Sequence, residues 1–448
     1  MKLKIENFCS IKKSTVIEPK PLTIFCGKNN TGKTYSLYML NALMDSRLQT
    51  SFEISKQYAK KLFEDRVLKV PAACLAGADA LELAQKNMAL SLQKMLPRFF
   101  AAENDFAENS LISLEIEAKT NFDFTLQRRG NDNKTWFKFV VDAGEAIFSL
   151  DEEARFPHDV ENSINTALSA FYSPNTHGRN FLLPAERSGL NLFFRELNSQ
   201  RAALLRHAAS STLDTAAILK DILVSRYPRP IHDYIEFMNS QPEIKKQKSE
   251  FSDLAVWLQK EVLKVKYKVD RYGDISIEPA RTGASLGLHM GSSTVKTFFG
   301  LWSYLNHLAR TGDWVMIDEP ELNLHPENQM LIARLIAQMV NRGINVVVST
   351  HSDYMVREWG NLIMLGERNF KGRDALMKKQ NISVAECMKP EQVSAYEFMQ
   401  DSARSMSISG DLGIQATLFD QSIQDLNMRT EAIYFARQEA LSAEAMND

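Results

Sequence analysis

The chain has 448 residues, 44% hydrophobic and 24% charged, which is the composition of an ordinary globular protein with two or three domains. The formal net charge of −2 excludes an overall attraction to nucleic acid or an anionic membrane, although a local basic patch stays compatible with it. The four cysteines are scattered, which excludes a cysteine metal site and fits a reducing cytoplasm. Residues 2–5 are already strand-like and no apolar run approaches the roughly 20 residues that span a bilayer, so we expect neither a signal peptide nor a membrane segment.

The first informative unit is a strand, a glycine loop and a helix in direct succession. The apolar run 22–26 leads into the octapeptide GKNNTGKT at 27–34, and a helical pattern follows over 35–44. A phosphate-binding P-loop requires this context, because glycines let backbone N–H groups turn toward phosphate oxygens and the helix adds its positive N-terminal end. Lys33 can reach the outer phosphates and Thr34 can bind Mg²⁺. We expect ATP to contact Gly27, Asn29, Asn30, Thr31, Gly32, Lys33, Thr34 and Tyr35.

Helical and strand patterns alternate through the next part of the chain. Residues 52–105 are mostly helical in pattern. Three runs with period-two alternation, together with a turn at 129–133, predict an antiparallel sheet from 111–117, 122–128 and 135–141. Residues 181–184 indicate a buried strand that ends at a proline. A helical pattern then covers 190–263 with a break at 227–230, and because heptads are not sustained we expect a compact helical insertion.

Strong α/β patterning returns in the last third of the chain, after a hairpin expected at 264–270 and 275–278. The expected elements are a helix at 297–308, a strand at 314–317, a helix at 327–341, and strands at 344–349 and 361–365. We therefore expect an α/β fold with an antiparallel β subdomain and a helical insertion. The expected division is an ATPase core over 1–189, the insertion over 190–263, the second part of the core over 264–367, and a helical tail over 368–448.

Two further strand ends carry polar residues suited to an ATP site. The apolar strand 314–317 ends in Asp318 and Glu319, and on a parallel sheet this end lies beside the P-loop. We expect Asp318 to hold Mg²⁺ and Glu319 to orient and deprotonate the attacking water. The buried strand 344–349 ends just before His351, which can contact the γ-phosphate. The alternative readings are a solvated strand end for the two acids and a structural role for the histidine.

These motifs resemble an ABC-type ATPase of the SMC/RecF/OLD branch, in particular its small AAA-15 and AAA-21 members. The resemblance rests on Asn7-Phe8 before the P-loop, on the run IDEPELNLHP at 317–326, on STHS at 349–352 and on LPAERSG at 183–189. The last segment falls where ABC proteins place their Q-loop, so the resemblance puts Glu186 and Arg187 at the site. It also implies an ABC-type nucleotide-binding domain and a homodimer or higher homo-oligomer, with ATP and Mg²⁺ shared between two chains.

The signature segment departs from the family pattern. In place of LSGGQ the chain has LHMGSSTVK at 288–296, before a helix. Small polar residues at a helix N-terminus can still bind a γ-phosphate, so we expect Gly291, Ser292 and Ser293 to form this half of the site. The alternative is a plain helix cap, because Ser and Thr are favoured there.

The sequence also bears on which process such an ATPase would control. After Asp318 the chain has no Asp-x-Asp pair, and all eight histidines lie at or before His351, so we expect no nuclease of its own. Three functions stay open. The first is an anti-phage defence ATPase that controls a separately encoded, nuclease-like effector, as the similar ATPase subunits of PARIS and Septu systems imply. The second is a RecF-like DNA-repair clamp that binds DNA directly, and the third is a transporter ATPase.

Overall fold

The computed structural model describes residues 1–45, 48, 50–127, 135–151, 156–173, 178–196, 227–280, 283–367 and 370–445. The middle of the expected insertion, residues 197–226, and the expected turn at 129–133 lie outside the described residues.

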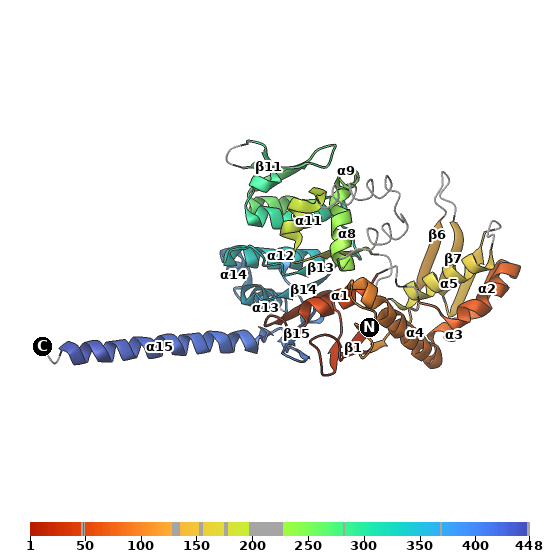
Figure 1. Cartoon of the computed structure of the whole chain (residues 1–448), viewed down its shortest axis with the longest axis horizontal. Coiled ribbons are helices and arrows are strands. Elements are labelled where there is room, and N and C mark those ends of the chain that lie inside the picture. Colours follow the sequence, from red (N-terminus) through yellow and green to blue (C-terminus); the bar gives the residue numbers. More distant parts are fainter. Residues whose placement is uncertain are drawn as a thin grey trace, which may run out of the picture.

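A six-stranded sheet forms the centre of the molecule (Figure 1). Its order is β16-β15-β3-β14-β13-β9, and all neighbours are parallel except the edge strand β16. Because parallel strands end at the same edge of a sheet, the polar residues that follow β3, β13 and β14 come together. The strands are β3 (Leu22–Gly27), β9 (Asn180–Leu183), β13 (Trp314–Asp318), β14 (Asn345–Thr350), β15 (Val393–Phe398) and β16 (Ala403–Ser405).

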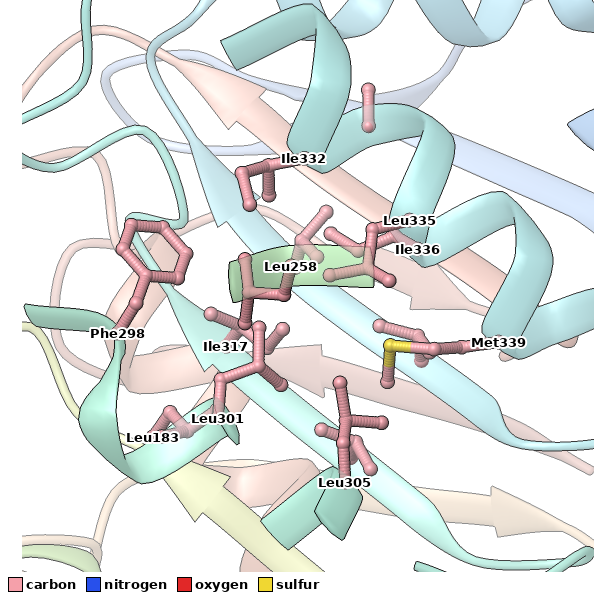
Figure 2. Packing of buried hydrophobic residues seen from close by; sticks show 14 of the residues in the cluster. Leu183, Leu258, Phe298, Leu301, Leu305, Ile317, Ile332, Leu335, Ile336 and Met339 are labelled. Atoms are coloured by element: carbon pink, nitrogen blue, oxygen red, sulfur yellow. The ribbon is translucent and has the colours of Figure 1, made fainter. Parts of the chain in front are cut away.

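Helices cover both faces of this sheet, which is why its central strands are apolar throughout. Ile317 of β13 faces α11 and α12, where it joins Leu301 and Ile332 in one hydrophobic core (Figure 2). The next residue back, Met316, faces the opposite side and packs in a second core with helix α1. The helices are α1 (Lys33–Leu43), α11 (Ser293–His307), α12 (Pro326–Asn341) and α13 (Asp353–Glu367).

The N-terminal part adds antiparallel β structure and helices beside α1. One sheet has the order β2-β1-β5 and the other the order β4-β8-β7-β6. The expected single sheet was therefore wrong in its partners, since 111–115 pairs with the first strand of the chain. Alternation of apolar and polar residues shows that one face of a strand is buried, but it does not show which strand pairs with it. The elements are β1 (Lys2–Glu6), β2 (Thr15–Ile17), α2 (Glu53–Asp65), β4 (Val67–Pro71), α3 (Ala73–Ala76), α4 (Ala78–Phe99), β5 (Leu111–Glu115), β6 (Phe122–Gln127), β7 (Thr135–Asp142), β8 (Glu145–Leu150) and α5 (Pro157–Tyr172).

The described part of the insertion is helical, as expected, and its helix α10 packs against α11. The hairpin after it is also confirmed, and a short third strand extends it to the order β10-β11-β12. The elements are α8 (Arg229–Asn239), α9 (Gln241–Ile244), α10 (Ser252–Leu258), a π-helical turn (Gln259–Leu263), β10 (Val265–Val269), β11 (Ile275–Pro279) and β12 (Leu286–Gly287).

Two expectations for the C-terminal part were wrong. Residues 361–365 are helical and lie in α13, because Trp359, Leu362 and Ile363 recur at a spacing that also fits one face of a helix. The expected tail at 368–448 contains β15, which is buried along its whole length in the central sheet. The sequence does not indicate a buried strand here, because the segment contains the polar residues Ser394 and Glu397. Both have partners in the structure: Ser394 Oγ lies 3.2 Å from Thr23 Oγ1, and Glu397 pairs with Arg404 at 2.6 Å.

The chain nevertheless ends in a helix, α15 (Thr417–Ala445), which runs away from the body of the molecule (Figure 1). All its described side chains, from 424 to 438, are exposed. Between α13 and α15 lie α14 (Arg373–Lys379), β15, β16, β17 (Ile408–Ser409) and β18 (Gly413–Ile414).

Candidate nucleotide-binding site

The loop between β3 and α1 has the backbone of a phosphate cradle. Gly27 has a φ of 146° and Gly32 one of 98°, values that favour glycine. At Gly27 a Cβ atom would lie 2.3 Å from the carbonyl oxygen of Phe398 on β15, so only glycine fits beside that strand. Helix α1 begins directly after Gly32, and its free N–H groups and dipole favour an anion there.

Lys33 places its ammonium group inside this loop. Its Nζ donates to the carbonyls of Gly27, at 3.2 Å, and of Lys28, at 2.7 Å. The side chain is buried, and this burial lowers the pKa of Lys33 although nearby acids, led by Asp318, oppose the shift. Phosphate oxygens would offer the ammonium a charged partner in place of these carbonyls.

The other expected P-loop residues divide into two groups. Thr31 is buried and its hydroxyl donates to the carbonyl of Lys28 at 2.8 Å, so it shapes the loop. Asn29 and Asn30 are exposed at the tip. The ring of Tyr35 packs edge-on against Phe8, with centroids 6.3 Å apart, and its side chain is partly open to solvent. All four residues lie at or beside the loop, but only Asn29, Asn30 and Tyr35 have exposed side chains.

Thr34, Asp318 and Ser349 meet where three strands end. Thr34 Oγ1 lies 3.2 Å from Asp318 Oδ1, and Ser349 Oγ donates to the same carboxylate oxygen. Asp318 is only 1% exposed, and burial raises its pKa to about 6. A hydroxyl and a carboxylate oxygen this close are hard donors of the kind that Mg²⁺ prefers, so Thr34 and Asp318 fit the expected metal role. Ser349 was missed as a partner, although it lies directly opposite Asp318 in the register of β13 and β14.

Glu319 lies beside His351. The carboxylate Oε1 lies 3.9 Å from His351 Nε2, and both side chains keep about a third of their surface exposed, at 36% and 30%. Burial, followed by the charge of Lys33, lowers the pKa of His351, which favours the neutral form of the ring. The φ of Glu319 is 50°, a left-handed conformation that costs a non-glycine residue roughly 1–2 kcal/mol. Such local strain is often found at functional sites.

Two hydrogen bonds hold this strained turn. The amide of Glu319 donates to the carbonyl of Ser349 at 2.9 Å. Glu321 Oε1 accepts from the amide of His351 at 2.5 Å, which ties the acidic strand end to the histidine. Burial raises the pKa of Glu321. Glu321 belongs to the run IDEPELNLHP, but the sequence did not predict its contact with the amide of His351.

The residues of the LPAERSG segment take different places. Glu186 is exposed, whereas Arg187 is buried with 2% of its surface exposed. The Arg187 guanidinium lies behind the end of β13, where it donates to the carbonyls of Asp318 and Glu319 at 2.6 Å each, so the expectation that Arg187 lines the site was wrong.

The expected signature residues lie at the N-terminus of α11. Ser292 caps this helix by accepting from the amide of Val295 at 3.3 Å, and Ser292 and Ser293 are exposed. Thr294 Oγ1 donates to the carbonyl of Asn323 at 2.6 Å, which links α11 to the loop after Glu319. Within the described ranges, no hydrogen bond joins 291–293 to the P-loop of the same chain.

A P-loop with an acidic strand end and a polar histidine on a mainly parallel sheet defines a nucleotide-binding α/β protein. The family model of the AAA ATPase domain, AAA_15, matches residues 1–177 and 182–356, and the chain belongs to this family. It is therefore an ATP-binding protein of the ATPase class. No curated protein matches the chain.

Three solved SMC head structures are similar to the chain at low sequence identity. An SMC head bound to the C-winged helix domain of ScpA is 13% identical, with a TM-score of 0.34 and coverage of 91% of this chain and 97% of that one. An SMC head domain with an extended coiled coil, bound to the C-terminal domain of ScpA and derived from Pyrococcus furiosus, is 12% identical, with a TM-score of 0.32 and coverage of 96% and 98%. The SMC head domain from Thermotoga maritima is 10% identical, with a TM-score of 0.29 and coverage of 91% and 98%. In the part of the chain that the structure describes, no helix is long and apolar enough to cross a membrane.

Proposed function

We propose that this chain hydrolyses ATP with Glu319 as the general base and uses the reaction as a switch. One observation supports this proposal most strongly: five polar side chains lie together at one edge of the sheet. They are Lys33, Thr34, Asp318, Glu319 and His351. Glu319 accepts a proton as the water oxygen bonds to the γ-phosphorus and the bond to the ADP oxygen breaks. Lys33 offsets phosphate charge, and neutral His351 donates a hydrogen bond to the γ-phosphate. Mg²⁺ held by Thr34 and Asp318 would supply further charge neutralisation.

The complete site is formed by two copies of the chain. At the N-terminus of α11, Ser292 and Ser293 are exposed and offer backbone N–H groups that suit a γ-phosphate, whereas the amide of the neighbouring Gly291 donates to the carbonyl of Leu288 at 3.0 Å. Because these residues make no hydrogen bond to their own P-loop among the described contacts, they are available to the P-loop of a partner. ATP then joins the two chains and hydrolysis releases them. The ATP-bound assembly is thus a homodimer or a higher homo-oligomer.

The switch controls a separate effector in anti-phage defence. This part rests on the resemblance to PARIS and Septu ATPases and on the lack of a nuclease motif after Asp318. Helix α15 offers a surface for the effector, since it carries exposed large apolar residues along a helix that runs away from the body. They are Leu426, Met428, Ile433, Tyr434 and Phe435, each 56–64% exposed.

Cross-linking between two different variants tests the composite site. One chain carries Asn29→Cys and the other Met290→Cys, both exposed positions, in a Glu319→Gln and Cys74→Ser background. Mixed chains should cross-link between positions 29 and 290 with Mg²⁺·ATP and not with ADP, and neither variant alone should form this cross-link. A chain carrying both substitutions that cross-links only within itself would contradict the composite site.

Nucleic-acid assays test the effector proposal. The purified chain should hydrolyse ATP while leaving DNA and RNA intact. Removal of residues after 416 should preserve hydrolysis and abolish binding of the effector. Metal-dependent cleavage that disappears on mutation of acids outside the ATP site would indicate a built-in nuclease. Salt-sensitive DNA binding that stimulates hydrolysis would instead favour the DNA-repair clamp.

A further inference from the structure

Arg187 is a buried cation whose described contacts are backbone oxygens. Its guanidinium donates to the carbonyl of Pro184 at 2.9 Å and to those of Asp318 and Glu319 at 2.6 Å each. No ion pair involves it among the described residues. Burying a charged group costs free energy unless the group is hydrogen-bonded. The three carbonyls offset this cost, and we ask what an arginine does here that a neutral side chain could not.

The chemistry of the guanidinium explains why arginine stands here. Three carbonyls converge on it, and a planar fork can donate to all of them at once, whereas a lysine ammonium is a single point. Its positive charge also lies near Asp318, Glu319 and Glu321, whose negative charges it offsets. An apolar residue of similar length would leave all three carbonyls without this donor.

The contact with Glu319 fixes the conformation of its backbone. The amide of Glu319 is held by Ser349 and its carbonyl is held by Arg187, so both ends of the left-handed residue are anchored. The Cα–Cβ bond of Glu319 therefore leaves the backbone in one direction, and its carboxylate lies 3.9 Å from His351 Nε2. A general base needs this orientation, because small displacements of a reacting group reduce the rate strongly.

The segment that carries Arg187 is itself held in place. Arg187 begins the helical residues 187–196, after a turn in which its amide donates to the carbonyl of Pro184 at 3.2 Å. Four residues on, Asn191 donates to the carbonyl of Lys296 on α11 at 2.6 Å and accepts from the Tyr234 hydroxyl at 2.8 Å. A side chain supported in this way can hold its neighbours to a defined geometry.

We propose that Arg187 is a positioning residue for hydrolysis, which fixes Glu319 so that its carboxylate meets the attacking water. This inference rests on the proposed role of Glu319 as the base. Arg187 touches neither nucleotide nor water in this scheme, so its loss reduces turnover and leaves ATP binding unchanged.

The experiment compares Arg187→Met and Arg187→Lys with the parent chain by ATP binding and by single-turnover hydrolysis. We expect the Met variant to lose on the order of 10²-fold in hydrolysis rate, and the Lys variant to lose less because it keeps the charge. The Kd for ATP should stay within about twofold of the parent. If the Met variant does not fold, the Lys variant carries the test.

A double variant separates positioning from a general structural role. Arg187→Met should slow hydrolysis no further in a Glu319→Gln background, because Arg187 acts through the base that Glu319→Gln has already removed. The matched control is Arg334→Met, which removes a partly buried arginine, paired with Glu358 at 2.5 Å, and should lower stability without changing the hydrolysis rate. Multiplied losses in the double variant, or a parent-like rate in Arg187→Met, would overturn the inference. Parent-like hydrolysis by Glu319→Gln would instead overturn the proposed base.

Discussion

The burial of Asp318 predicts a measurable conflict between stability and metal binding. Folding takes this carboxyl from an ordinary pKa of 3.8 to about 6, and its residue is only 1% exposed. A rise of this size corresponds to about 3 kcal/mol of destabilisation once the pH exceeds both values. Asp318→Asn removes the buried charge, and the new amide oxygen can still accept from Thr34 and Ser349. We therefore expect the nucleotide-free variant to be more stable than the parent at pH 8, by about 1–3 kcal/mol.

The sign of the pH dependence follows from the direction of the shift. Because the folded pKa of Asp318 is raised, the proton favours the folded state, and this contribution is lost as the pH rises through about 6. The advantage of the Asn variant should thus shrink to about half at pH 5. Urea unfolding in EDTA at pH 5 and pH 8 measures it. With Mg²⁺·ATP the order should reverse, since the variant has lost a metal ligand.

Asp313, at the other end of β13, provides the matched control. It is also 1% exposed, but its two oxygens accept from the amides of Arg179 and Arg310 and from the Tyr304 hydroxyl, at 2.7–3.0 Å. An amide group cannot accept at its nitrogen, so Asp313→Asn should cost about 1–3 kcal/mol at both pH values. Equal destabilisation by both substitutions, or a difference for Asp318→Asn that does not change with pH, would refute the reasoning.

Three other substitutions have distinct expected results. Lys33→Ala should weaken ATP binding about 10–100-fold, because it removes a charge-assisted contact to phosphate, as isothermal titration would measure. His351→Ala should retain ATP binding and slow hydrolysis by about tenfold in a single-turnover assay, since it removes a donor to the γ-phosphate. Gly27→Ala should lower stability by about 2 kcal/mol or more in urea, because its Cβ would lie 2.3 Å from Phe398 O; at Gly144, with positive φ but nothing within 4 Å, the same change should cost less.

Local patterns predicted the parts of the site that the chain carries on single segments. The P-loop, the acidic strand end and His351 each follow an apolar run, and the rule that parallel strands end together was enough to assemble them. The pairing of Thr34 with Asp318 agrees with that assembly. What the sequence did not indicate is the register, which alone places Ser349 opposite Asp318.

The misassigned parts depend on contacts between distant segments. Strand β15 is polar enough to look exposed, and its place beside β3 depends on partners such as Thr23, which Ser394 contacts across a separation of 371 residues. Residues 361–365 fit a strand as well as a helix when only their hydrophobicity is considered. The resemblance put Arg187 at the ATP site, yet its side chain is buried behind the end of β13, where it donates to three backbone carbonyls. No local pattern reveals such partners.

The most direct test of the proposed mechanism is ATP binding and single-turnover hydrolysis by Glu319→Gln. The amide cannot take the proton of the attacking water, so we expect ATP binding like that of the parent and a hydrolysis rate lower by on the order of 10²–10⁴. The exposed Glu327→Gln on α12 serves as the isosteric control and should behave as the parent does. Hydrolysis by Glu319→Gln at the parent rate would contradict the assignment of Glu319 as the general base.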